Sequence, residues 1–259
     1  MSELHFPTSI PVGISECLMG VQVRHDGSHK HSKYCTQTLT GWFEFVPVCP
    51  EMGIGMGSPR EAIHLQGSMA HDAIRAIGNR TATLDVTDKL IAYGIEKGTE
   101  LTQLCGYILM GRSPSCGMER IKLYHENGMP LGKTSAGLYA REFMRQQPLL
   151  PIEEEGRMQD ARLRENFVAR VFAYKRWRDL LENGLTLAKL QEFHAQHKYL
   201  LLSHHQPAYR YMGQVVAHAH QRPIADVAEE YGRIFMETLK RVATNQNHTN
   251  VLQHLMGYV

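Results

Sequence analysis

The chain has 259 residues, of which 43% are hydrophobic and 21% are charged, a composition that excludes a disordered chain and leaves room for one large domain or two ordinary ones. It contains no run of roughly eighteen apolar residues and begins without an export signal, which argues against a membrane span or secretion. We therefore expect a cytoplasmic protein with no membrane association, whose five cysteines are reduced.

The first part of the chain predicts a parallel α/β sheet. Short apolar runs that end at glycine, proline or cysteine occupy residues 11–17, 43–49 and 107–111, and such runs are typical of buried strands. Helical periodicity covers residues 85–105, where Gly94 and Gly98 weaken the pattern, and a further helix is expected over 135–145. Strands that alternate with helices indicate a Rossmann-like parallel sheet.

The second part predicts an all-helical domain. Helical patterns cover residues 159–182, 187–203, 208–220 and 224–244. The acidic stretch 146–156, which is interrupted by prolines, is typical of a linker. We therefore predict an α/β domain over residues 1–155 and a smaller all-α domain over residues 156–259.

The two predicted domains differ in charge. Residues 1–156 hold 14 Lys and Arg against 17 Asp and Glu, whereas residues 157–259 hold 14 against 9, so the net charge of +2 divides into −3 and +5. A basic helical part favours contacts with nucleic-acid phosphates, although an ordinary solvated face is the alternative. The candidate phosphate contacts are Arg170, Lys175, Arg176, Arg178 and Lys198.

Three of the five cysteines follow predicted strands. Cys17 and Cys49 end the first two strands, and Cys116 lies shortly after the third. Because the carboxyl ends of parallel strands form the ligand-binding edge of a sheet, these thiols are expected to converge. Three thiolates without a fourth suit an iron-sulfur cluster with one open iron better than structural zinc. The alternative is burial as small hydrophobic groups, which we expect of Cys35 and Cys105.

The residues beside these cysteines offer acid–base and anion-binding groups. Glu51 follows the second cysteine and could move protons. Ser113 and Ser115 precede the third cysteine, with turn chemistry around the intervening proline as the alternative role. Candidate phosphate contacts are Arg24, Lys30, Lys33 and Arg60, with a solvated surface charge as the alternative for each.

Other patterns are less specific. A zinc site built from His25, His29, His31 and Cys35 lacks a second closely spaced pair of ligands. The glycines within residues 53–57 lack the spacing of a dinucleotide fingerprint. Neither pattern is expected to define the function.

The motifs around the three cysteines resemble the thiouracil desulfidase (TudS) family. They are, in chain order, ISECLMG at 14–20 with RHDG at 24–27, VPVCPE at 46–51, SPRE at 58–61 and SPSCG at 113–117. The resemblance implies that sulfur is removed from a thiolated uracil with a 4Fe-4S cluster, and that the cluster is bound by cysteines corresponding to Cys17, Cys49 and Cys116.

This chemistry suggests roles for the neighbouring residues. We hypothesise a hydrolysis without redox change, in which Glu51 is the proton donor or base and Ser113 positions the base edge or the water. Arg24, Arg60 and Ser115 are then expected to contact the substrate. A dehydratase that acts on a small acid with an iron-sulfur cluster would use the same three thiolate ligands, and it remains an alternative.

Residues 175–177, 193–201 and 248–258 resemble the uncharacterised YbgA-type helical domain. Fusions of the two domains resemble desulfidases that act on 4-thiouridine in tRNA, so the resemblance implies tRNA as the partner; we expect a monomer with no protein partner. Such helical domains continue beyond the point where this chain stops at Val259, which implies a shortened RNA-binding surface. Two alternatives stay open: a desulfidase of free thiouracil, and a nucleic-acid-binding module with a structural metal site.

Overall fold

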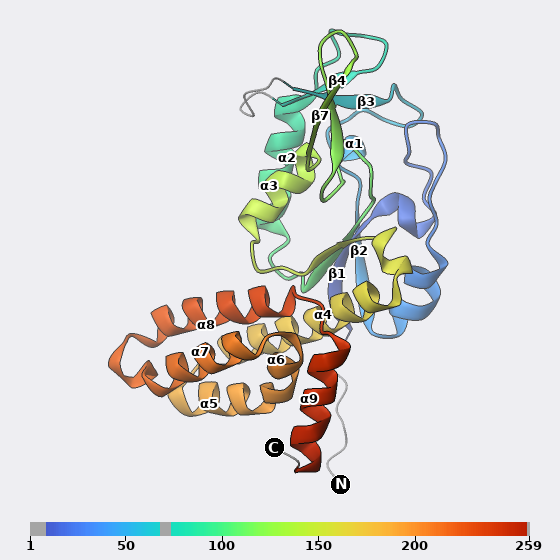
Figure 1. Ribbon diagram of the computed structural model, residues 1–259. Coiled ribbons are helices and arrows are strands. Elements are labelled where there is room, and N and C mark those ends of the chain that lie inside the picture. The colour runs from blue at the N-terminus through green and yellow to red at the C-terminus, as the bar shows by residue number, and fades with distance from the viewer. Residues whose placement is uncertain (1–8, 68–73, 258–259) are drawn as a thin grey trace. The chain divides into compact units, whose positions relative to one another are not determined.

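The computed structural model describes residues 9–67 and 74–257. The chain forms two compact units, Met1–Gln159 and Asp160–Val259, and each is described by itself. Figure 1 shows strands and helices in the first unit and helices alone in the second. Among the described residues, no helix combines the length and the apolar character needed to cross a membrane.

The first unit is built on a four-stranded parallel sheet, as the alternation of strands and helices predicts. Its strand order is β2 (Phe43–Val48), β1 (Ile10–Ser15), β5 (Gly106–Leu109) and β8 (Ile152–Glu154). All four residues of β5 are buried, and the apolar residues of β1 are buried as well, which is typical of central parallel strands covered on both faces.

The fourth strand lies where the sequence predicts a linker. Glu153 of β8 is only 3% exposed, and Arg157 donates to it over 2.6 Å from Nε to Oε1. Residues 152–154 are therefore an edge strand rather than a linker, because a neighbouring arginine compensates the acidic side chain that made the stretch look solvated.

A second, mixed sheet was not predicted. Its order is β4 (Arg75–Gly78), β3 (Ile63–Gln66), β6 (Ile121–Tyr124) and β7 (Pro130–Ser135). Strands β3 and β6 pair in parallel, and both outer pairs are antiparallel. Three of these strands have only four residues, too few for a clear alternation of apolar and polar side chains.

Two helices of the first unit, α2 (Thr87–Glu100) and α3 (Leu138–Gln146), pack side by side (Figure 1). A Cβ atom at Gly94 would lie 2.7 Å from the carbonyl oxygen of Tyr139, and one at Gly98 would lie 2.6 Å from Cβ of Gln146. The two glycines that weaken the helical pattern are thus the positions where the helices approach most closely. Short helical turns complete the unit: η1 (Glu16–Met19), η2 (Tyr34–Thr38), η3 (Leu39–Gly41), α1 (Pro50–Gly53) and η4 (Arg157–Gln159).

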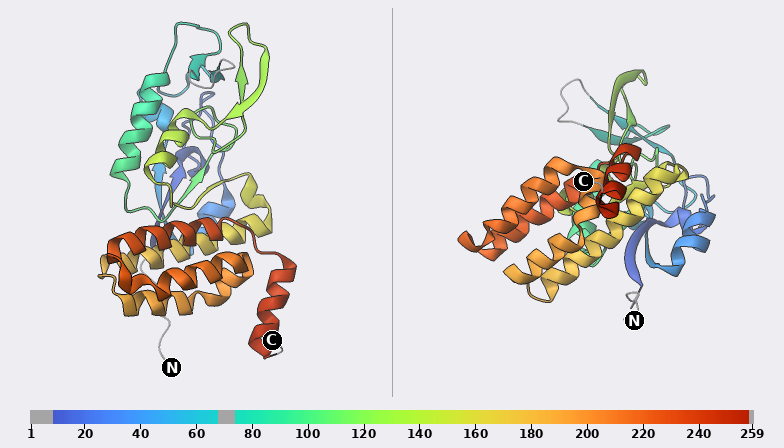
Figure 2. Two further views of the ribbon diagram at one scale, coloured as in Figure 1. Left: turned by 60° about the vertical axis from the view of Figure 1, so that its left-hand side comes forward. Right: turned by 60° about the horizontal axis from the view of Figure 1, so that its bottom comes forward.

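The second unit is helical, as predicted. It consists of α4 (Ala161–Glu182), α5 (Leu187–Gln196), α6 (Lys198–His204), α7 (Gln206–Ala217), η5 (Ala219–Gln221), α8 (Ile224–Leu239) and α9 (Asn245–Met256). Figures 1 and 2 show α4, α5, α7 and α8 running alongside one another, with α9 at an angle to them. The core between the helices is aromatic and includes Trp177, Phe193, Tyr231 and Phe235.

Two predicted helices of this unit are interrupted. The helix predicted over 187–203 breaks at His197, whose buried ring stacks on Phe193 at 4.0 Å and whose Nδ1 lies 2.7 Å from the Phe193 carbonyl oxygen. The helix predicted over 224–244 ends at Leu239, and the separate helix α9 follows. The break at His197 serves aromatic packing, which helical periodicity does not reveal.

Candidate active site

The carboxyl ends of three parallel strands lead into the three cysteines singled out above. Cys17 lies in η1 directly after β1, Cys49 lies between β2 and α1, and Cys116 lies in the loop after β5. All three line one cavity of about 430 Å³. Cys35 and Cys105 are also free and buried, but they do not line this cavity. The sheet therefore brings together three thiols that are distant in sequence.

Burial dominates the acidity of these thiols. It raises the pKa of Cys17 to about 11, with Cys49 as the next largest cause. Burial also raises the pKa of Cys49, and it raises that of Cys116 well above the usual range. Three neighbouring thiols, two of them buried, resist becoming thiolates together, so a bound metal centre is the natural source of the positive charge that would stabilise them.

A single metal ion does not fit the arrangement. Across residues 9–67 and 74–257, no group of three or more His, Cys, Asp or Glu could hold a metal ion. The zinc site considered around His31 and Cys35 is therefore not supported. The cysteines of an iron-sulfur cluster bind different irons, so their sulfur atoms need not meet around one ion.

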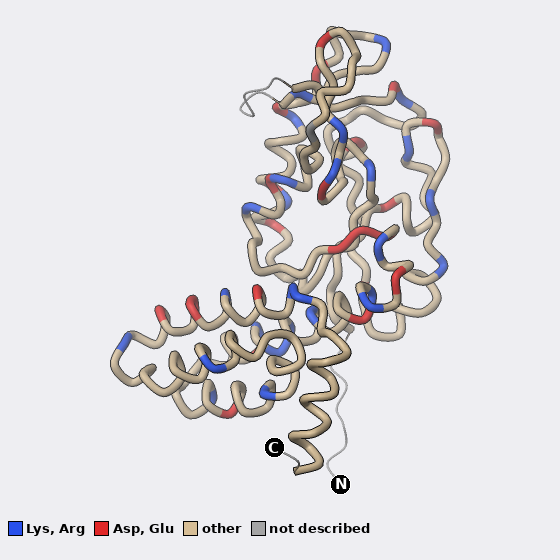
Figure 3. The backbone as a smooth tube through the Cα atoms, in the orientation of Figure 1, with Lys and Arg blue, Asp and Glu red and all other residues tan. Residues whose placement is uncertain are grey.

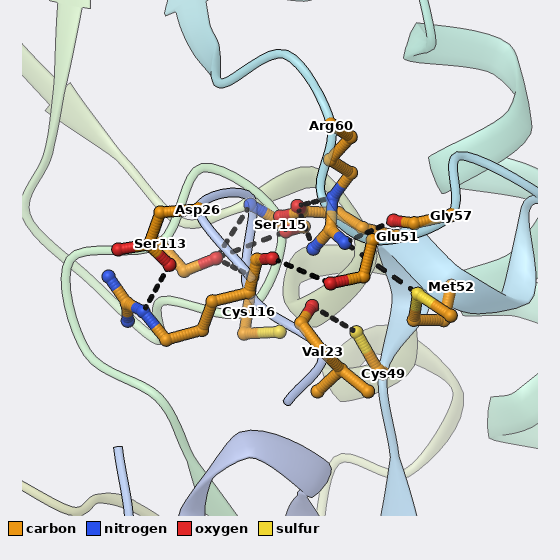
Figure 4. A network of polar contacts seen from close by, with 12 residues as sticks. Val23, Asp26, Cys49, Glu51, Met52, Gly57, Arg60, Ser113, Ser115 and Cys116 are labelled. Carbon is orange, nitrogen blue, oxygen red and sulfur yellow. Dashed lines mark hydrogen bonds and ion pairs between the residues drawn. The ribbon is translucent and has the colours of Figure 1, made fainter. Parts of the chain in front are cut away.

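Glu51 is fixed at the cavity by two side chains. Arg60 donates to Oε2 of Glu51 from Nε over 2.7 Å, and its Nη2 lies 2.5 Å from the same oxygen. The hydroxyl of Ser115 donates to Oε1 (Figure 4). The side chains of Arg60 and Glu51 are 5% and 13% exposed. In Figure 4 the sulfur atoms of Cys49 and Cys116 lie on one side of this carboxylate, which is thus held close to the thiols.

Ser115 and Arg60, which were predicted to contact the substrate, bind Glu51 instead. Ser115 is 0% exposed and does not line the cavity, so its hydroxyl cannot meet a substrate there. The guanidinium of Arg60 lines the cavity, but it binds Glu51 and the carbonyl oxygen of Gly57. Both residues position Glu51, a role hidden from the sequence because Ser115 is 64 positions away from it.

Ser113 makes the turn contacts expected as its alternative role, and it also lines the cavity. Its Oγ accepts hydrogen bonds from the backbone N–H groups of Ser115 (3.3 Å) and Cys116 (3.1 Å), which is turn chemistry. It also lines the cavity and lies 3.0 Å from Oγ of Ser115. Because the only hydroxyl proton of Ser115 goes to Glu51, Ser113 is the donor in this contact. A chain of hydroxyl groups therefore joins Ser113 at the cavity to Glu51.

Further cations line part of the cavity wall. Arg24 lines it as expected, and its Nε lies 3.7 Å from Oδ1 of Asp26. Lys30 and Arg112 line it too. Arg112 was missed in the sequence, although it directly precedes the SPSCG motif and could have been found from that position.

The candidate phosphate contacts of the helical unit are only partly available. Arg170 is 7% exposed, so it is a core residue and the prediction of a phosphate contact there is wrong. Lys175 and Arg178 form ion pairs one helical turn away, with Asp179 and Glu182. Arg176 is exposed, and Nζ of Lys198 lies 5.3 Å from the centre of the Tyr199 ring. Both acidic and basic residues lie along α8 (Figure 3).

Comparisons with known proteins match each part of the chain separately. Residues 198–259 match a family of unknown function, DUF1722. The uncharacterized protein YbgA of Escherichia coli K12 is 36% identical over 98 residues, which cover 38% of this chain and 58% of that protein. The uncharacterized protein YbbK of Bacillus subtilis 168 is 32% identical over 117 residues, which cover 40% of this chain and 71% of that protein.

A solved structure is similar as well. It is a [4Fe-4S]-dependent thiouracil desulfidase, TudS, which is 25% identical and has a TM-score of 0.45; the match covers 59% of this chain and 95% of that one. The model of the 2-thiouracil desulfurase family matches residues 12–155, more than half of the chain, and these residues include the three cysteines of the cavity and Glu51. The chain therefore belongs to the 2-thiouracil desulfurase family.

Proposed function

We propose that this chain is a cytoplasmic enzyme that removes sulfur from 4-thiouridine in tRNA by hydrolysis, with a 4Fe-4S cluster held by Cys17, Cys49 and Cys116. The observation that carries the proposal is that three free thiols from three separate strand ends line the same cavity as Glu51. Thiolates are the ligands that iron-sulfur clusters take, and three of them leave one iron without a protein ligand.

The residues of the cavity suit such a reaction. A cluster held by Cys17, Cys49 and Cys116 would supply an iron that acts as a Lewis acid. Glu51 takes a proton from the attacking water or gives one to the departing sulfide, and Arg60 and Ser115 hold its carboxylate in place. The hydroxyl chain from Ser113 offers a path for that proton. The reaction balances as a thiocarbonyl and water giving a carbonyl and hydrogen sulfide.

The charge of the helical part supports tRNA as the substrate. Residues 157–259 carry 14 Lys and Arg against 9 Asp and Glu, and Arg176 is exposed among them. Cations of this kind bind phosphates without regard to sequence. A thiolated base that is stacked in tRNA has to be flipped out of the stack before it enters the cavity.

The test is anaerobic reconstitution of the full chain with iron and sulfide. Cys49→Ala should lose the brown absorbance and the release of sulfide together, whereas Cys35→Ala should keep both, because Cys35 is buried away from the cavity. A colourless variant that still releases sulfide would end the cluster proposal.

A comparison of two substrates tests whether the enzyme acts on tRNA or on the free base. Thiolated tRNA and free 4-thiouracil should be compared at equal concentration, with loss of the thiocarbonyl absorbance as the measurement. We expect turnover of the tRNA. Turnover of the free base alone would overturn the tRNA assignment and leave a desulfidase of free thiouracil.

A further inference from the structure

A second cavity of about 410 Å³ lies beside the cysteine cavity on the first unit. The two cavities share Ile63, Arg112 and Pro114 in their walls, so they are adjacent. Strands β3 and β6 of the mixed sheet supply most of the second cavity. We call it the basic groove; its remaining lining residues are His64, Leu65, Asn79, Arg120, Ile121, Lys122 and Tyr124.

Three cations line the basic groove. Arg112, Arg120 and Lys122 line it, and none of its described lining residues is Asp or Glu. Arg112 and Lys122 are exposed, and neither side chain forms a hydrogen bond or ion pair with another described residue. Arg120 is 78% exposed and lies 3.4 Å from Glu119, a contact too solvated to neutralise it. These charges stand out in a domain whose net charge is negative.

Aromatic rings lie in the same groove. The rings of His64 on β3 and Tyr124 on β6 meet edge to face, with centroids 5.8 Å apart. Nδ1 of His64 lies 3.0 Å from Oδ1 of Asn79, which fixes the histidine ring. Aromatic rings beside cations are the combination by which proteins bind single-stranded nucleic acid, because bases stack on the rings while cations hold the phosphates.

The backbone links the groove to the cysteine cavity. Arg112 and Arg120 have φ values of 62° and 60°, a left-handed conformation that is uncommon for residues other than glycine. They stand at the two ends of the loop that carries Ser113 and Cys116. Such conformations persist where the surrounding structure defines them, and they are frequent at ligand-binding sites. The loop that presents the third cysteine therefore also presents cations to the groove.

We propose that the basic groove binds the phosphates and one flanking base of a polynucleotide whose thiolated base occupies the cysteine cavity. The inference rests on the proposed function and deepens it, since it places a polynucleotide subsite in the desulfidase domain itself. A free base fills the cysteine cavity alone and makes no contact with the groove. The groove thus favours RNA over the free base by supplying contacts that only RNA can use.

The test uses the full chain with Arg120→Gln and Lys122→Gln combined, and Lys89→Gln as the matched control. Lys89 is an exposed lysine on α2 outside both cavities. Binding of unmodified tRNA is measured by fluorescence anisotropy at several salt concentrations. The double variant should bind at least about tenfold more weakly. Its plot of log affinity against log salt should be shallower by roughly 1.4 to 1.8, because each lost phosphate contact removes about 0.7 to 0.9 from the slope.

A catalytic comparison separates this inference from the proposed function. In the reconstituted enzyme, the ratio of kcat/KM for thiolated tRNA to kcat/KM for free 4-thiouracil should fall at least about tenfold in the double variant and stay unchanged in Lys89→Gln. If the parent enzyme acts on tRNA and the double variant keeps its tRNA affinity, its salt slope and its ratio of kcat/KM values, the basic groove is not a polynucleotide site and the proposed function stands. If the double variant loses tRNA binding while the parent turns over only the free base, the function is wrong and the groove stands. A parent chain that does not bind tRNA overturns the groove.

Discussion

The buried ion pair between Arg60 and Glu51 predicts a large loss of stability when only one partner is removed. In Arg60→Met, the Glu51 carboxylate would lose two N–H donors at 2.7 and 2.5 Å, and it would stay in a place where its side chain is 13% exposed. An uncompensated charge of this kind costs roughly 3 to 5 kcal/mol of folding free energy. The low exposure of both side chains leaves little solvent screening to reduce that cost.

The first unit provides a control that differs mainly in burial. Arg75 binds Asp85 from Nε and Nη2 at 3.1 and 2.7 Å, but the side chains are 49% and 33% exposed. Arg75→Met should therefore cost only about 0.2 to 1 kcal/mol. Combining Glu51→Gln with Arg60→Met removes the stranded charge, so the double variant should recover at least roughly half of the loss caused by Arg60→Met.

Native-state hydrogen exchange is the suitable assay, because the two units of the chain need not unfold together. Amides of β1 and β5 report the opening of the first unit in the cluster-free protein. The burial argument is refuted if Arg60→Met lowers their protection no more than Arg75→Met does. It is equally refuted if the double variant is as unstable as Arg60→Met.

Further predictions concern the carboxylate, a helix contact and buried histidines. Ser115→Ala should lower kcat by roughly tenfold or more, because Glu51 loses a hydrogen bond. It should also change the pH profile of kcat. An unchanged profile would mean that the serine contributes only to packing. Gly94→Ala should destabilise the first unit by about 1 to 3 kcal/mol in urea unfolding. Gly213→Ala is the control and should be neutral or stabilising, because its Cβ would meet nothing closer than 3.6 Å. Equal effects of the two substitutions would contradict the close packing of α2 on α3. Burial lowers the pKa of His204, so the unfolded state binds more protons than the folded state at low pH. The helical unit should therefore lose stability as the pH falls below about 6.5. Equal urea midpoints at pH 7 and pH 5.5 would contradict this prediction.

The convergence of the cysteines was predictable because it depends on a topological rule. Parallel strands end at one edge, so residues that follow β1, β2 and β5 meet there wherever they lie in the sequence. The inference needs only the strand positions, and those were visible as short apolar runs. Glu51 came with them because it follows Cys49 by two positions in the sequence.

Other features depend on pairings that no local pattern encodes. Glu153 looks solvated in a run of three glutamates, yet it is buried because Arg157 lies one turn further on and binds it. Arg170 falls on a mostly polar side of a helical pattern but packs inside the helical unit. Ser115 and Arg60 acquire their roles from a carboxylate on another segment. For Ser115 and Arg60 the deciding partner is a tertiary neighbour that the local sequence does not reveal, whereas for Glu153 and Arg170 only the fold shows that the side chain is buried.

Charge gives the clearest example of this difference between composition and structure. The helical part has the basic total, but Lys175, Arg178, Arg222 and Arg233 lie in ion pairs with acidic side chains of that part, which reduces the field available to a phosphate. The acidic domain has cations in the basic groove with no acidic lining residue among those described. Because the potential at a surface depends on which charges remain uncompensated nearby, the negative total of the first domain does not prevent a local site for a polyanion in the basic groove. If the groove binds RNA as proposed, the substrate phosphates lie beside the thiols, where they can help to place the thiolated base.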